Sequence, residues 1–317
     1  MPDATPLQPH LHGLAFRTSE TDLHGATRAR LRRKDVTHPH HGVSAVDLDV
    51  DSIVGSCWAY QPLMAHGQFF SHITAAILFG MPLPPTATDG SPLDGSPLHV
   101  SVLGAATRPR TQKIVGHGLS AGDVQTTIQL GFAVVGPADT WCHLAAMLTP
   151  NDIVAIGDYL ISGARMKSGR QPPLATRAEL AAARARHHGR RGARTITWAL
   201  PRLRTSVDSR PETLLRLMLL DAGYPEPLIN DATAVDDETA ILHPDLKWPQ
   251  WRIVLEYEGD GHRENPKRFR EDIKRKERFE AAGWRVIRVT SDDLFVDQLG
   301  FLERVRLTVA RQRARTV

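Results

Sequence analysis

The sequence predicts an α/β protein with a C-terminal α-β-β-α-β core, preceded by a region in which short strands mix with helices. Three observations lead to this prediction. A chain of 317 residues, 41% of them hydrophobic, is long enough for about two domains. Apolar runs of helical and of strand period alternate between residues 205 and 300. Residues 171–204 combine a Pro pair, an Ala-rich stretch and a basic turn, which is typical of a helical connector.

Composition narrows the class of protein. The chain carries 39 Lys and Arg against 35 Asp and Glu, and the formal net charge of +4 permits an acidic partner. Its two cysteines, Cys57 and Cys142, are too few for a disulfide scaffold or a Cys-rich zinc site. The apolar stretch 73–81 is too short to span a bilayer. We therefore expect a cytoplasmic protein without a membrane segment.

Residues 1–50 contain a short basic helix. It carries four closely spaced arginines: Arg28, Arg30, Arg32 and Arg33. These arginines favour contact with DNA phosphates, as in a small winged-helix segment. A solvated basic face is the alternative interpretation.

Residues 51–170 predict a mixed α/β region. The run SHITAAILFG at 71–80 predicts a helix, and the runs at 98–103 and 132–136 predict short strands separated by loops.

Residues 205–317 show the clearest order of elements. Ser209 and Glu212 form a capping-box pattern that predicts a helix over 209–222. Two extended runs follow between residues 240 and 258, with one more strand expected near Leu228. A helix over 266–282 and a strand over 284–289 complete the domain.

The strand over 252–258 carries the main chemical argument. Alternation of side chains places Glu256 and Glu258 on one face together with Val254. If Pro249-Gln250 is a two-residue turn, Asp245 pairs with Val254 and shares that face. Lys247 then joins the same face.

Three carboxylates so close together raise one another's pKa unless a positive charge neutralises them. A divalent cation with oxygen ligands does so, which predicts Mg²⁺-assisted cleavage of a phosphodiester by Asp245, Glu256 and Glu258, with Lys247 and Glu212 nearby. The alternative is an exposed sheet face on which Lys247 and Arg252 pair with the acids.

The helix over 266–282 has two different faces. Ile273 and Phe279 define its buried arc, and Asp272 and Lys276 fall within that arc, where they either serve a site or pair with each other. The outer face carries three candidate phosphate contacts, which are Lys274, Arg275 and Arg278.

Three stretches together point to a family. The runs SRPETLLRLMLLDAGYPEP, PDLKWPQWRIVLEYEGDGH and DIKRKERFEAAGWRVIRVT resemble the endonuclease domains related to very-short-patch-repair (Vsr) nucleases, within the PD-(D/E)XK superfamily. The resemblance covers about residues 205–300. It implies a restriction-endonuclease-like αβββαβ core, dependence on Mg²⁺ or Mn²⁺, and nicking or cleavage of DNA.

The resemblance also implies roles for single residues. Glu212 matches the acid of the first helix, Asp245 the Asp of the PD element, and Glu256 the acid of the (D/E)-X-K element. Asp272 and Arg275 match a D-x-x-R pattern. Glu258 stands where the superfamily usually has Lys, and Lys247 is the candidate for the missing positive charge. His262 either assists a proton transfer or is a surface histidine after a turn.

The preceding region resembles an abortive-infection type IV antitoxin-like segment of actinobacterial proteins, through its basic helix, the HHGV turn, SHITAAILFGMP and FAVVGPADTWCHLAAML. We expect a DNA endonuclease or nickase of repair or phage defence. The rival is a DNA-binding antitoxin-like or regulatory module that keeps the nuclease fold as a platform. Homodimerisation and a toxin or defence-system partner stay open.

Overall fold

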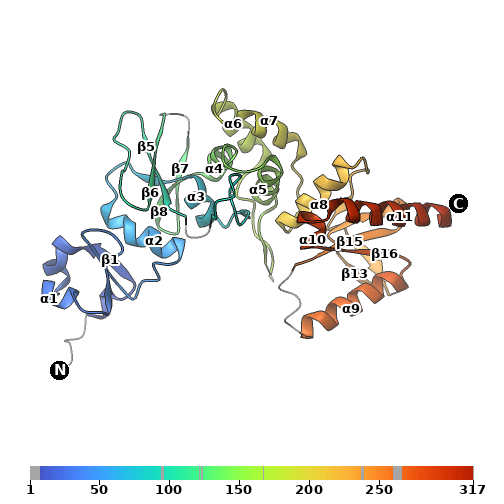
Figure 1. Cartoon of the computed structure of the whole chain (residues 1–317), viewed down its shortest axis with the longest axis horizontal. Coiled ribbons are helices and arrows are strands. Elements are labelled where there is room, and N and C mark those ends of the chain that lie inside the picture. Colours follow the sequence, from blue (N-terminus) through green and yellow to red (C-terminus); the bar gives the residue numbers. More distant parts are fainter. Residues whose placement is uncertain are drawn as a thin grey trace. The chain divides into compact units, whose positions relative to one another are not determined.

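A computed structural model gives the fold of the chain, which forms two compact units (Figure 1). The first comprises Met1–Thr149 and Arg177–Thr197, and the second Pro150–Thr176 and Trp198–Val317. The expected connector over 171–204 is thus divided between the two units. The structure describes residues 8–93, 96–120, 122, 124–166, 168–236, 239–259 and 266–316.

The first unit begins with a three-stranded antiparallel sheet in the order β1-β3-β2. Its strands are β1 (Leu14–Arg17), β2 (Val36–Thr37) and β3 (Val43–Val46). The basic helix α1 spans only Arg28–Leu31 and is capped by Thr27. A four-residue helix beside this sheet does not confirm the expected winged helix.

A five-stranded mixed sheet, in the order β6-β5-β4-β8-β7, forms the rest of the first unit. The expected strands are present as β5 (Leu98–Leu103) and β8 (Phe132–Val135). The other strands are β4 (Phe69–Phe70), β6 (Ile114–Leu119) and β7 (Thr126–Gln129).

Helices accompany this sheet. The expected helix at 71–80 is α3 (His72–Leu78), which contacts β5 and α4. The others are α2 (Ile53–Tyr60), α4 (Pro137–Leu144) and α6 (Arg177–Arg186), followed by α7 (Ala193–Ala199).

A four-stranded sheet in the order β11-β14-β15-β16 is the centre of the second unit. Its strands are β11 (Leu228–Ile229), β14 (Leu246–Trp248), β15 (Ile253–Glu258) and β16 (Arg285–Thr290). The strands β15 and β16 are parallel, and the crossover between them contains α9 (Pro266–Ala281). The order α8, β14, β15, α9, β16 confirms the predicted α-β-β-α-β order, with β11 as the additional strand near Leu228.

The remaining elements of this unit surround the sheet in sequence order. They are α5 (Pro150–Ser162), β9 (Arg165–Met166), β10 (Gly169–Arg170), α8 (Arg210–Asp221), β12 (Thr233–Val235), β13 (Ala240–Leu242), α10 (Ser291–Phe295) and α11 (Gln298–Thr316).

An apolar core holds α8 and α11 to the sheet. Leu215 and Leu219 of α8 and Phe301 and Val305 of α11 pack with Trp248 of β14, and all five are buried. Removal of this apolar surface from water is the main stabilising term for the unit.

The turn between β14 and β15 differs from the prediction. A 3₁₀ turn over Pro249–Trp251 and the left-handed Arg252 (φ 49°) replace the expected two-residue turn. Trp248 therefore pairs with Ile253, and Lys247 pairs with Val254. The register is shifted by two residues from the predicted one. A shift of two keeps every side chain on its face, so the predicted shared face is retained.

Two further expectations concern composition. Cys57 and Cys142 are both free and buried, in agreement with the absence of a disulfide scaffold. Among the described residues, no helix is both long and apolar enough to cross a membrane.

Candidate active site

Asp245 immediately precedes β14 and faces the neighbouring strand. Its Oδ2 accepts a hydrogen bond of 2.7 Å from the backbone N–H of Tyr257 in β15. One further step in the β14–β15 register places Asp245 opposite Glu256. The strand pair thus brings two of the predicted carboxylates to the same end of the sheet.

The charge environment of Asp245 is unusual. Burial raises the pKa of this carboxyl from 3.8 to about 8, and the negative charges of Glu212 and Glu256 raise it further, against the Tyr257 hydrogen bond and the positive Arg275. A shift of this size and origin is typical of functional sites, because folding has concentrated negative charge where water cannot screen it.

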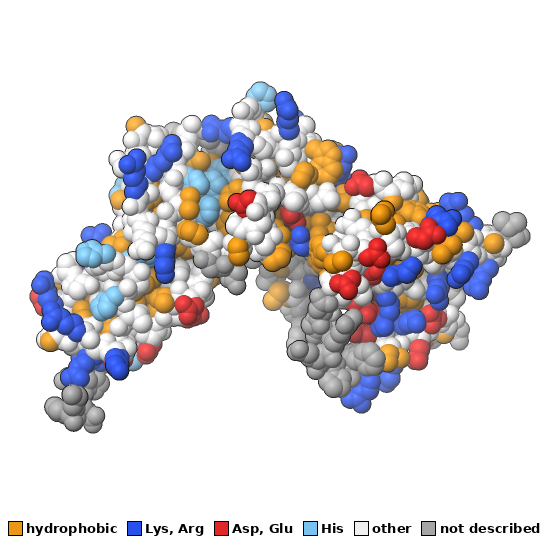
Figure 2. All heavy atoms as spheres, in the orientation of Figure 1, with side chains coloured by type: hydrophobic (Ala, Val, Ile, Leu, Met, Phe, Trp, Pro, Cys, Tyr) orange, Lys and Arg blue, Asp and Glu red, His pale blue; other side chains and the backbone are white. Residues whose placement is uncertain are grey.

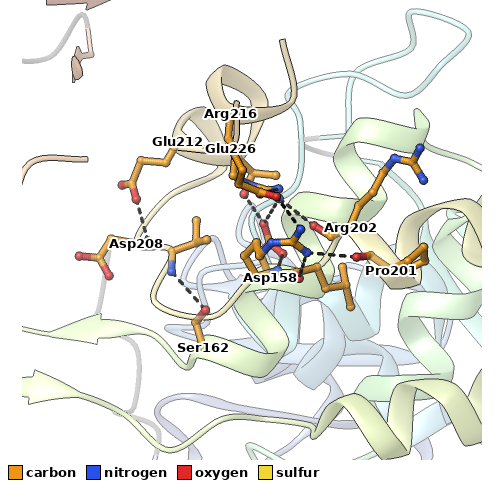
Figure 3. Close-up of polar contacts among 12 residues, drawn as sticks. Asp158, Ser162, Pro201, Arg202, Asp208, Glu212, Arg216 and Glu226 are labelled. Atoms are coloured by element: carbon orange, nitrogen blue, oxygen red, sulfur yellow. Dashed lines mark hydrogen bonds and ion pairs between the residues drawn. The ribbon is translucent and has the colours of Figure 1, made fainter. Parts of the chain in front are cut away.

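Glu212 is held at the start of α8. Ser209 caps this helix through its hydroxyl, as predicted, but the Glu212 carboxylate bonds to the N–H of Asp208 (3.0 Å) instead of the N–H of Ser209 (Figure 3). Burial raises the pKa of Glu212 to about 7. Glu212 and Asp245 therefore resist simultaneous ionisation.

Asn230 connects these two acids, and the sequence reasoning missed it. Its side-chain amide donates to Glu212 Oε2 (2.8 Å), and its backbone N–H donates to the carbonyl oxygen of Asp245 (3.0 Å). The residue has a positive φ of 47°, a conformation that Asn tolerates better than most residues. An Asn directly after the short strand β11 was the available signal.

A buried ion-pair network fixes α8, and so Glu212, against α5. Arg216 of α8 donates to Asp158 of α5 (3.1 Å), to Glu226 (2.8 Å) and to the carbonyl of Arg202 (2.9 Å), as Figure 3 shows. Thr213 adds a hydrogen bond of 2.8 Å to Asp158. Burial raises the pKa of Asp158 to about 6 despite the adjacent guanidinium.

Glu256 is neutralised by a residue of α9. Its Oε1 accepts from Nε (2.8 Å) and Nη2 (2.7 Å) of Arg275, which also donates to the carbonyl of His243. Arg275 was predicted on the outer face of the helix, and this is wrong: its side chain reaches inward to the carboxylates. Its match to the D-x-x-R pattern was the better guide.

A cavity of about 200 Å³ opens at this point. It brings together Asp245, Glu256, Glu258 and Asp272 of the predicted set. Its lining is Asp245, Glu256, Tyr257, Glu258, Asp272, Arg275, Lys276, Val286 and Arg288. The cavity is large enough for a hydrated cation or a phosphate group.

Two predicted participants are engaged elsewhere. The Lys247 ammonium lies on the predicted face but binds Asp231 (2.5 Å), the carbonyl of Ala232 (2.8 Å) and the hydroxyl of Thr233 (3.0 Å). Lys247 therefore does not line the cavity. Glu258 lines it, but its carboxylate forms an ion pair with Arg288 of β16.

Lys276 supplies the lysine that the cavity contains. It lines the cavity, and its printed ion-pair partner, Glu280, is 3.7 Å away. The helical pattern had placed Lys276 and Asp272 on the inward arc, which their position in the cavity confirms. Ile273, expected in the same arc, is 37% exposed, because α9 turns its polar residues toward the site.

A second hollow of about 560 Å³ adjoins the cavity and shares Glu258, Lys276, Val286 and Arg288 with it. Figure 2 shows Lys and Arg side chains over this part of the chain. The basic residues that line the hollow are Lys276, Arg285, Arg288, Arg304 and Arg311. We call this set the basic cleft.

The other predicted phosphate contacts are dispersed. Arg278 pairs with Asp236 (2.7 Å), and Lys274 is exposed on α9. In the first unit Arg30 forms a two-pronged ion pair with Asp35 (2.6 and 2.9 Å). The exposed basic residues there are Arg28, Arg32 and Arg33. His262 lies outside the described residues.

The donor set of the cavity suits a hard cation, because Mg²⁺ prefers oxygen ligands and accepts one or two carboxylates. Among the described residues, however, the carboxylates do not form a group of three whose oxygens all lie within 4.8 Å of one another; only three histidines of the first unit meet that criterion. Two carboxylates with water thus fit better than three.

Comparisons with known proteins find no matching family model, no similar curated protein and no similar solved structure.

Proposed function

We propose that the protein is a divalent-metal-dependent nuclease that hydrolyses phosphodiester bonds of DNA at the cavity lined by Asp245 and Glu256. One observation carries this proposal: the pKa of Asp245 is raised to about 8 by burial and by the acids beside it, so the folded chain holds negative charge that its own residues do not neutralise. The resemblance to Vsr-like PD-(D/E)XK domains supports the same function and a restriction-endonuclease-like core.

In this proposal Asp245 and Glu256 would hold Mg²⁺ or Mn²⁺, with Glu212 orienting a ligand from its position beside Asp245. When bound, the cation would withdraw electrons from the scissile phosphate and lower the pKa of a bound water. Arg275 would exchange its bond to Glu256 for a phosphate oxygen, because a guanidinium binds carboxylate and phosphate with similar geometry.

Lys276 takes the part that the superfamily gives to the lysine of its (D/E)-X-K element. It is the lysine in the cavity, and its ammonium would stabilise the negative charge that develops on the phosphate. Lys274, two residues earlier on α9, is exposed and provides a matched control of the same residue type.

The basic cleft gives the substrate a path to the cavity. Its cations lie next to the carboxylates, and a polyanion that follows them would be led to the metal ligands. Both strand and helix residues contribute, since Arg288 belongs to β16, and Arg304 and Arg311 belong to α11.

The test is cleavage of supercoiled plasmid by purified protein in Mg²⁺, Mn²⁺ or EDTA. We expect metal-dependent nicking that falls at least about 100-fold in Asp245→Asn and in Lys276→Met, in line with the loss of a metal ligand or of an electrostatic stabiliser. Asp221→Asn, at an exposed acid, and Lys274→Met should cleave like the wild type. Equal cleavage by all four variants would reject the proposed site.

A second function is favoured by one observation. Glu258 and Lys247 are held by Arg288 and Asp231, so neither stands ready to activate water. A non-catalytic DNA-binding module of antitoxin-like or regulatory type would keep the basic cleft and the exposed arginines Arg28 and Arg32. It predicts salt-sensitive DNA binding without cleavage, unchanged by Asp245→Asn and abolished by charge reversal in the basic helix.

A further inference from the structure

Histidines distant in the sequence meet in the first unit. His72 is the first residue of α3, His99 lies in β5 and His117 lies in β6. Because Ser101 of β5 pairs with His117 of β6, His99 and His117 project from the same face of the sheet. Figure 2 shows histidine side chains at the surface of this unit.

The three rings converge on one point. One ligand nitrogen from each ring can be chosen so that all three lie within 4.8 Å of one another. The Nδ1 of His99 is 2.9 Å from the Nε2 of His117, and the ring centroid of His72 is 3.8 Å from that of His117. Two imidazole nitrogens on one tetrahedral Zn²⁺ are roughly 3.3 Å apart, as Zn–N distances of about 2.0–2.1 Å require. Small movements would therefore complete the site.

Simple packing does not account for two features of this cluster. His143 of α4 stacks on His72 at 4.5 Å and is 7% exposed, yet its Nδ1 has no hydrogen-bond partner among the described residues. A buried polar atom without a partner costs about 1–3 kcal/mol. His72 also has a left-handed backbone with φ 49°, which is unfavourable for a residue other than Gly or Asn. A core of apolar side chains would avoid both costs.

Hydroxyl groups orient His72 from behind. The Ser71 hydroxyl lies 2.9 Å from the Nδ1 of His72 and accepts a hydrogen bond of 2.7 Å from the Ser101 hydroxyl. With Nδ1 protonated, His72 donates to Ser71 and presents the lone pair of Nε2. Such a bond from the second ring nitrogen is the usual support of a metal-bound histidine.

We propose that His72, His99 and His117 bind one Zn²⁺ ion, with the fourth position open to water or to an oxygen-donor ligand. Neutral imidazole nitrogens suit zinc and other late divalent metals and do not suit Mg²⁺. Three protein ligands with one open position are typical of zinc sites that act on a ligand. The unpartnered Nδ1 of His143 would hydrogen-bond to that ligand. Ser71 is a positioning residue.

The experiment uses the full chain without a histidine tag. The protein is loaded with Zn²⁺, desalted and analysed for metal by mass spectrometry, and its zinc affinity is measured by competition with a zinc indicator in excess Mg²⁺. We expect one zinc per chain, a higher melting temperature with zinc, and visible absorption of tetrahedral type when Co²⁺ replaces it.

Variants then locate the site. His117→Gln, at a half-buried strand position, should weaken zinc binding by more than the roughly 10–100-fold that we expect for Ser71→Ala. His66→Gln, at an exposed turn, is the matched control and should bind like the wild type. Asp245→Asn should also keep its zinc, which separates this site from the proposed nuclease site.

Two results would overturn the proposal. One is wild-type protein that retains only substoichiometric zinc after loading, a result that does not depend on the folding of any variant. The other is loss of affinity in His66→Gln equal to that in His117→Gln, which would mean that zinc binds surface histidines at random.

Discussion

Replacing Asp245 by Asn should stabilise the protein near neutral pH, although it removes the central acid of the proposed site. The Asp245 carboxyl has a pKa of about 8 in the folded chain against an ordinary 3.8. Between these values the unfolded chain releases the proton that the folded chain retains, so the free energy of unfolding falls as pH rises. Below pH 4 both states are protonated and the penalty vanishes.

The magnitude follows from the two pKa values. At pH 7 the ordinary pKa is exceeded by about three units, and each unit is about 1.4 kcal/mol, which gives an upper limit of about 4 kcal/mol. Part of this is shared with Glu212, whose pKa of about 7 falls when its neighbour loses its charge. Asn also retains an oxygen that can accept from the Tyr257 N–H. We expect Asp245→Asn to gain about 2–4 kcal/mol at pH 7 and almost nothing at pH 4.

Calorimetric unfolding of both proteins across this pH range is the assay, with and without Mg²⁺. A cation that binds Asp245 stabilises the wild type by about 2.7 kcal/mol at one hundred times its dissociation constant and leaves the Asn variant unchanged. A variant that is less stable than the wild type at pH 7, or a difference that does not change with pH, would refute the reasoning.

Three further predictions address the support of the site. Arg216→Met should cost about 3–5 kcal/mol in urea unfolding, because it leaves Asp158 buried without its ion-pair partner, and the double variant with Asp158→Asn should lose less than the sum of the two. Gly163→Ala should cost about 1–3 kcal/mol more than Gly223→Ala: both glycines have positive φ, but only at Gly163 would a Cβ meet a backbone carbonyl, and equal melting temperatures would contradict this. Arg311→Ala in the basic cleft should reduce the salt slope of DNA binding by about one, and an unchanged slope would remove Arg311 from the interface.

The sequence was sufficient to predict the element order of the second unit, because each boundary carries local chemistry. Ser209 caps α8, and Gly283 follows α9 with φ 80°. The register between β14 and β15 was missed because a 3₁₀ turn ending in left-handed Arg252 has no distinctive sequence signal. The carboxylates still meet, since an error of two residues preserves the faces of a strand.

Other parts of the site depend on contacts distant in the sequence. Lys247 was predicted on the correct face, but the loop containing Asp231 captures its ammonium, and that loop is not visible in strand alternation. Arg275 turns inward because Glu256 lies opposite α9 once the parallel pairing with β16 is formed. His72 and His117 meet only through the five-stranded sheet, and their spacing matches no metal-binding motif.

The central claim is tested most directly by the ratio of DNA cleavage to DNA binding for wild type and Asp245→Asn. Both proteins are brought to equal saturation of the same supercoiled plasmid, and nicking is followed in Mg²⁺. The account predicts similar affinity, with nicking by the variant reduced at least about 100-fold. Equal nicking rates at equal saturation, or no nicking by either protein, would contradict it.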